Sequence, residues 1–153
     1  MKAEYINPFL KATLNVLKTM AFTEATPGKP YLKKEPTATG DISGIVGLTG
    51  EVEGSLSITF TEPCICHIVS NMFGEPVEGI NPDVVDAVGE ITNMISGDAR
   101  RELEEKGVVL KGSLPSVITG KGHTINHITS GPVIAIPFET QAGSFTVEVS
   151  MRE

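Results

Sequence analysis

The sequence predicts an α/β (α+β) sandwich, in which a mainly antiparallel sheet of about six strands carries two long helices on one side and is accompanied by one short helix. Three observations predict this class. Apolar residues recur at helical spacing in three segments, and six other segments have strand-like composition. The 16 Gly and 10 Pro, without any Trp, favour short elements joined by tight turns. The elements follow the order α-βββ-αα-βββ, which suits packing in layers. Residues 1–153 are expected to form a single domain.

The first predicted helix covers residues 4–21, where apolar residues form one stripe at intervals of three and four. Pro8 falls within about the first turn, where a missing N–H is least harmful. The stripe consists of Ile6, Phe9, Leu10, Leu14, Leu17 and Met20.

Six segments are predicted as strands. The clearest two are the arms of a hairpin whose turn contains Gly50. Glycines in this hairpin match no phosphate-binding loop and mark bends or close packing. The last segment alternates between apolar and polar side chains, so one of its faces is expected to be wet. The six segments are residues 31–34, 42–49, 54–61, 112–119, 133–139 and 144–151.

Two further helices are predicted between the two groups of strands. The short one runs from Glu62 to about Phe73 and ends at Gly74. The long one begins after Asn81, a favourable N-cap that is followed by proline, and runs to about Lys106. Its expected buried stripe consists of Val84, Val88, Ile91, Ile95 and Ala99, with Val85 and Leu103 at the edge.

The outward face of the long helix has an unusual composition. Glu90 and Asn93 are three residues apart and therefore neighbours on this face, Gly97 lies one turn beyond, and Gly89 lies at the margin. Asn is a poor helix former, and each interior glycine costs about 1 kcal/mol relative to alanine. Two solvated residues would be the ordinary interpretation of an arbitrary Glu-x-x-Asn. Here the combination favours a functional surface, on which the glycines leave room for the backbone of another protein.

Charge and cysteine content limit the possible partners. The net charge is −7, and the basic residues are scattered, so no nucleic acid is expected as a partner. No segment has the length of a membrane span and no signal peptide is evident, so no membrane insertion is expected. Cys64 and Cys66 are expected to be small core residues of a reduced, cytoplasmic protein. His123 and His127 have no third ligand nearby, so no metal site is expected.

Four residues on and near the outward face follow a family pattern, which is an acidic residue, a glutamate, an asparagine and a later proline. Here they are Asp86, Glu90, Asn93 and Pro115, within DAVGEITNMISGDARREL and GSLPSVITG. Together with the order of the elements, they resemble the CheC/CheX/FliY family of bacterial chemotaxis phosphatases, and within it the single-site CheX branch. The resemblance extends over nearly the whole chain. The spacing from Asn93 to Pro115 is slightly shorter than the corresponding spacing in the family pattern.

The resemblance implies hydrolysis of the aspartyl phosphate on a CheY-type response regulator. Glu90 would pair with a lysine of the regulator, Asn93 would orient the attacking water, and Asp86 would be a supporting acid. The regulator would supply Mg²⁺, so no cofactor is expected on this chain. One active site is expected, because the first helix has Asn15 but Ala12 where a second glutamate would be needed.

The resemblance also implies a homodimer, and an open sheet edge at the terminal strand is the expected interface. An alternative function stays open at this point. The same family includes components of the flagellar switch, so the chain could be a non-catalytic binding or scaffold module there or in another two-component pathway. A scaffold would not need Glu90 and Asn93 together, whereas a phosphatase would.

Overall fold

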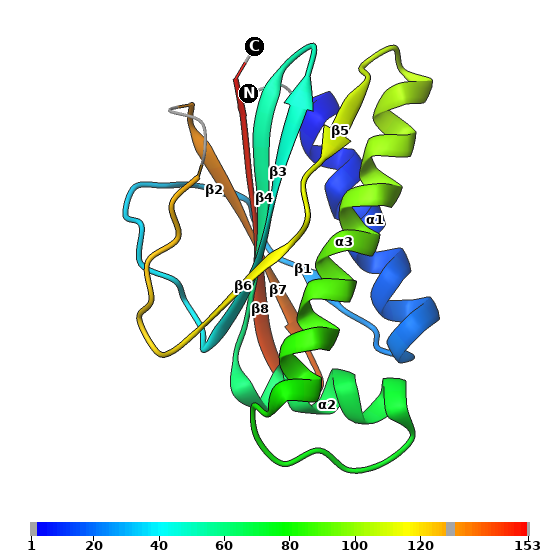
Figure 1. Cartoon of the computed structure of the whole chain (residues 1–153), viewed down its shortest axis with the longest axis vertical. Coiled ribbons are helices and arrows are strands. Elements are labelled where there is room, and N and C mark those ends of the chain that lie inside the picture. Colours follow the sequence, from blue (N-terminus) through cyan, green and yellow to red (C-terminus); the bar gives the residue numbers. More distant parts are fainter. Residues whose placement is uncertain (1–2, 128–130, 153) are drawn as a thin grey trace.

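The computed structural model describes residues 3–127 and 131–152 and shows an antiparallel sheet with α1 and α3 side by side on one face (Figure 1). Its helices are α1 (Ala3–Ala21), α2 (Glu62–Phe73) and α3 (Pro82–Glu105). Its strands are β1 (Thr26–Pro27), β2 (Tyr31–Lys33), β3 (Ile42–Gly50), β4 (Glu53–Phe60), β5 (Leu110–Gly112), β6 (Ser116–Thr119), β7 (Val133–Thr140) and β8 (Gly143–Arg152). The predicted fold class and order of elements are confirmed.

The sheet has the strand order β1-β7-β8-β4-β3-β5, with β2 also paired with β7 and β6 with β3. The described residues thus form eight strands rather than about six, because each edge consists of two short strands in succession. The predicted strand at residues 112–119 is interrupted at residues 113–115, which include Pro115, and its ends become part of β5 and β6. Proline has no N–H for a strand ladder, so a break at this position is expected on physical grounds.

The prediction of a wet face on residues 144–151 is wrong. β8 is buried on both faces, and Glu148 is only 1% exposed. Residues 34–41 and 120–127 form long connections on the side of the sheet opposite α1 and α3 (Figure 1). His127, in the second connection, lies with Nε2 3.0 Å from Oε1 of Glu148. The alternation in this strand therefore reflects polar packing partners rather than water.

β8 also lies in the middle of the sheet, between β4 and β7. Its register with β4 runs from Phe60 opposite Phe145 to Glu53 opposite Arg152. The terminal strand therefore leaves no open edge, and the expectation of a dimer through this strand is wrong. The edges of the sheet are formed by β1 with β2 and by β5 with β6.

α1 differs from its prediction in two details. The described helix starts at Ala3, so Pro8 lies inside it, beyond the first turn. Met20 is 41% exposed rather than part of the buried stripe, whereas Thr13 is fully buried. The hydroxyl of Thr13 can be buried because it donates to the Phe9 carbonyl (2.7 Å). The buried face is also broader than the predicted stripe, because α1 packs against α3 as well as against the sheet.

α3 matches its prediction closely and is held near the sheet. Asn81 caps it by accepting a hydrogen bond from the backbone N–H of Val84 (2.9 Å), and the whole predicted apolar stripe is buried apart from Val85 at its edge. In β3, a Cβ on Gly44 would collide with the hydroxyl of Thr92 on α3. Glycine at this position therefore allows the helix and the strand to approach closely. Among the described helices, none has the length and apolar character needed to cross a lipid bilayer.

Candidate functional site

The long helix presents Asp86, Glu90 and Asn93 to solvent, as the helical spacing predicts. The opposite side of the same helix is packed into the core, with Val88 and Ile95 fully buried. The three polar side chains therefore sit on a support whose orientation is fixed by the core. Such a support suits a catalytic group that must keep its direction.

Within the described part of the chain, neither the side chain of Glu90 nor that of Asn93 makes a hydrogen bond or an ion pair. Other asparagines are engaged: Asn15 Nδ2 donates to Asp98 Oδ2 (3.4 Å), and Asn71 Nδ2 donates to the carbonyl of Ala21 (2.9 Å). The carboxylate of Glu90 and the amide of Asn93 are thus solvated and available to a partner molecule.

The two helix glycines differ in their surroundings. Gly89 is buried, and a Cβ there would lie 3.6 Å from Val117 and 3.8 Å from Pro115. Gly89 therefore faces this chain's own β5–β6 region, and the expectation that it offers space to a partner is wrong. Gly97 is half-buried, and a Cβ there would meet only Arg100, at 4.0 Å. Gly97 is the glycine that leaves open space on the face.

The proline of the family pattern lies beside the predicted site. The connection between β5 and β6 runs along α3 (Figure 1), with Pro115 against Gly89 and Gly112 close to the guanidinium of Arg100. Leu114, in the same connection, is 89% exposed. The sequence predicts this residue inside a strand, so its exposure was missed. The one available signal is the proline that follows it.

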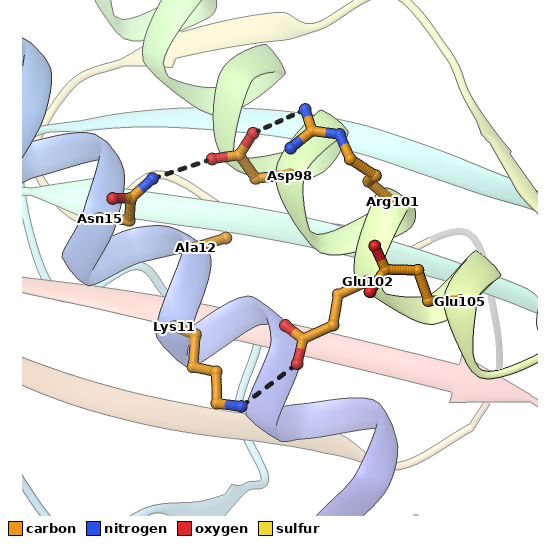
Figure 2. A pocket seen from close by; sticks show the side chains of 7 residues that line it. All are labelled: Lys11, Ala12, Asn15, Asp98, Arg101, Glu102 and Glu105. Atoms are coloured by element: carbon orange, nitrogen blue, oxygen red, sulfur yellow. Dashed lines mark hydrogen bonds and ion pairs between the residues drawn. The ribbon is translucent and has the colours of Figure 1, made fainter.

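A groove between α1 and α3 lies on the other flank of the helix, and Figure 2 shows the side chains that line it. It is a shallow pocket of about 280 Å³. Most of its polar groups are paired with one another: Lys11 with Glu102 (3.2 Å), and both Asn15 and Arg101 with Asp98 (3.4 and 3.0 Å). The contacts of Lys11 and Asn15 join the two helices. Ala12 is buried where a second site would need a glutamate.

The histidines and cysteines have structural surroundings. His123 Nε2 is 2.6 Å from Ser43 Oγ, and His127 contacts Ser55 and Glu148. Burial raises the pKa of the Cys64 thiol to about 11, so this residue is a neutral core group at physiological pH. Among the residues that the structure describes, no cluster of three or more His, Cys, Asp or Glu side chains could hold a metal ion.

The comparisons with known proteins point to one family. The model of the family described as chemotaxis phosphatase CheX matches residues 42–139, which include Asp86, Glu90, Asn93 and Pro115. The CheY-P phosphatase CheX of Thermotoga maritima is 25% identical over 138 residues, which cover 90% of this chain and 88% of that protein.

Solved structures of related proteins have the same fold. A CheC-like superfamily protein from Shewanella sp. PV-4 is 46% identical, with a TM-score of 0.94 and full coverage of both chains. CheX from Borrelia burgdorferi, in a complex with CheY, BeF3 and Mg²⁺, is 29% identical, with a TM-score of 0.83 over 97% of this chain and 98% of that one.

Proposed function

The chain belongs to the family of the chemotaxis phosphatase CheX, and from this we propose that it hydrolyses the phospho-aspartate of a CheY-type response regulator with Glu90 and Asn93 on α3. One observation carries the assignment of residues. The carboxylate and the amide are neighbours on an exposed helix face, and neither has a partner within the described part of the chain. A relative has been crystallised with CheY, BeF3 and Mg²⁺, which supports a regulator as the partner.

In the proposed reaction, the oxygen of a water attacks phosphorus in line with the bond to the aspartate oxygen. That bond breaks, and the products are the free aspartate and inorganic phosphate. The amide of Asn93 holds the water in line, because its oxygen accepts a hydrogen bond from the water. Glu90 forms an ion pair with a lysine of the regulator and sets the position of α3 over the phosphate.

The remaining parts of the proposed site have supporting roles. Asp86 lies one helical turn before Glu90 on the exposed face and adds negative charge towards a basic partner surface. Gly97 leaves room for the regulator to approach beyond Asn93. Mg²⁺ belongs to the regulator in this proposal, and this chain holds no cofactor.

The test is the decay of a phosphorylated regulator with catalytic amounts of the wild type, Asn93→Ala and Glu90→Ala. Asn93→Ala is expected to lower kcat by about 100- to 10,000-fold, which corresponds to roughly 3–5 kcal/mol of lost orientation. Its affinity for the regulator activated with BeF3⁻ should stay within about threefold of the wild type. Glu90→Ala should weaken binding as well, because it removes the ion pair.

Asn15→Ala is the matched control, because it removes an exposed amide from a helix surface outside the proposed site. It should leave both kcat and affinity unchanged. A wild type that binds the activated regulator without speeding its dephosphorylation would favour a non-catalytic binding module instead. Retention of wild-type kcat by Asn93→Ala would remove the amide from the mechanism.

A further inference from the structure

Leu114 stands out among the apolar side chains of the surface. It is 89% exposed, more than any other large apolar residue that the structure describes, the next being Phe22 at 78%. Single exposed leucines are common in soluble proteins and need no explanation by themselves. Leu114 differs from an ordinary exposed leucine in two ways: its backbone is ordered, and it lies close to Asn93.

The backbone around Leu114 is fixed on both sides. Before it, β5 pairs with β3 through Gly112 opposite Leu48, and after it β6 pairs with β3 through Ser116 opposite Ile45. Ser113 is bonded twice to Gly47: its N–H donates to the carbonyl (2.9 Å), and its Oγ accepts from the N–H (2.8 Å). The leucine is therefore presented on an ordered backbone, so binding has to order only its side chain and not the chain around it.

The same connection places Leu114 beside Asn93. Pro115 lies against Gly89, and Gly112 lies against Arg100, so the chain from Pro115 back to Gly112 runs along α3 in the same direction as the helix does from Gly89 to Arg100 (Figure 1). Asn93 is one turn beyond Gly89 and about 40° around the helix from it. By these dimensions, Leu114 is within about 15 Å of Asn93.

We propose that Leu114 is a specificity-determining contact that docks into an apolar hollow on the phosphorylated regulator, next to the aspartyl phosphate. The inference rests on the proposed function. A specific interface covers about 800 Å² on each partner, which corresponds to a radius of roughly 16 Å. A regulator that brings its phosphate to Asn93 therefore covers Leu114 as well. A regulator with a polar surface at that place would bind more weakly, because Leu114 would be buried against polar groups. This contact therefore selects among regulators.

The experiment compares the wild type with Leu114→Ala. We expect the Kd for the regulator activated with BeF3⁻ to rise about tenfold, because part of an apolar side chain is removed from the interface. KM for the phosphorylated regulator should rise by a similar factor, with kcat within about twofold of the wild type, which is the pattern of lost uniform binding. Leu114→Met, which keeps an apolar side chain of similar volume, should restore most of the affinity.

The matched control is Leu32→Ala, which truncates a leucine that is 53% exposed on β2, at the opposite edge of the sheet. It should change neither Kd nor KM. An active wild type whose Kd and KM are unaltered by Leu114→Ala would overturn the docking role and leave the phosphatase proposal intact. A fall in kcat with unchanged KM would overturn it too, as would a change in the oligomeric mass without a change in Kd. A wild type that neither binds nor dephosphorylates any regulator would overturn the proposed function itself.

Discussion

Glu148 carries a carboxylate into the buried layer between the sheet and the connections that cover it. Lys33 Nζ lies 2.6 Å from one of its oxygens and His127 Nε2 lies 3.0 Å from the other. Burial by itself raises the pKa of this carboxyl. The hydrogen bonds and charges of His127 and Lys33 outweigh burial, so that the pKa lies below its ordinary value. The cluster ties β2, β8 and the connection at residues 120–127 together.

The lowered pKa predicts how the stability of the protein depends on pH. The native state holds the proton of Glu148 less tightly than the unfolded chain does. The contribution of Glu148 to the stability of the fold is complete above the pKa of the unfolded chain, which is near 4.5. It is lost as the pH falls through the lower pKa of the folded state. Urea unfolding from neutral pH to about pH 3 should therefore show that Glu148→Gln lowers the free energy of unfolding at neutral pH, by roughly 3 kcal/mol, and flattens its decline in acid.

Glu75→Gln is the control for this measurement, since Glu75 is exposed in the connection after α2. It should change the free energy of unfolding by less than about 0.5 kcal/mol at any of these pH values. If Glu148→Gln and Glu75→Gln had equal effects across the range, the buried cluster would not be the source of the acid dependence.

At the scale of elements, α3 is well packed, but its Gly97 is not needed for any close contact within this chain. A Cβ at Gly97 would have open space around it, so Gly97→Ala is expected to stabilise the helix by about 1 kcal/mol. The melting temperature should rise by about 2–4 °C. If the regulator uses the space at this position, KM should rise in the same variant although the fold is more stable.

Gly44→Ala provides the opposite case, because a Cβ at this position would overlap Thr92 of α3. It should destabilise the protein by about 1–3 kcal/mol in the same thermal scans. An unchanged melting temperature in Gly97→Ala would mean that the helix does not gain stability from the alanine. A lowered melting temperature would mean that the added methyl group collides with a neighbouring residue.

The helices could be predicted from the sequence because their signals are local. Asn81 caps α3 through Val84, and Gly74 ends α2 in the left-handed conformation with a φ of 72°, so both boundaries are set within a few residues. The same periodicity placed Glu90 and Asn93 on the exposed face. Which of these exposed groups act in catalysis stays a prediction, because exposure alone does not determine reactivity.

Features that depend on distant segments could not be predicted in this way. Gly89 lies at the margin of the outward face on a helical wheel, but Pro115 and Val117 from another part of the chain cover it. Glu148 alternates with apolar residues as a wet strand would, but residues 120–127 bury it. Residues 120–127 have no periodic pattern of their own, and the strand pattern around Val117 does not indicate which helix it contacts, so no local rule anticipates either contact.

At the scale of the whole molecule, homodimer formation stays a prediction from the family resemblance. β8 is internal, so a dimer would have to use another surface, such as the edge of β1 and β2 or that of β5 and β6. Light scattering at micromolar concentration should give about twice the chain mass of 16.2 kDa. A mass that stays at that of one chain up to about a hundredfold higher concentration would contradict the dimer.

The central place of β8 has a consequence for how the chain folds. The hairpins β3–β4 and β7–β8 each join neighbouring segments, so they can form early from local contacts. The sheet becomes continuous only when β4 meets β8, and their paired residues are separated by more than half the chain, including α2 and α3. Closing so long a loop is slow, and the chain with β4 still uncovered exposes a strand edge that other chains can join. High protein concentration during refolding speeds pairing between chains but not the joining of β4 and β8 within one chain, so it should favour aggregation over the native sheet.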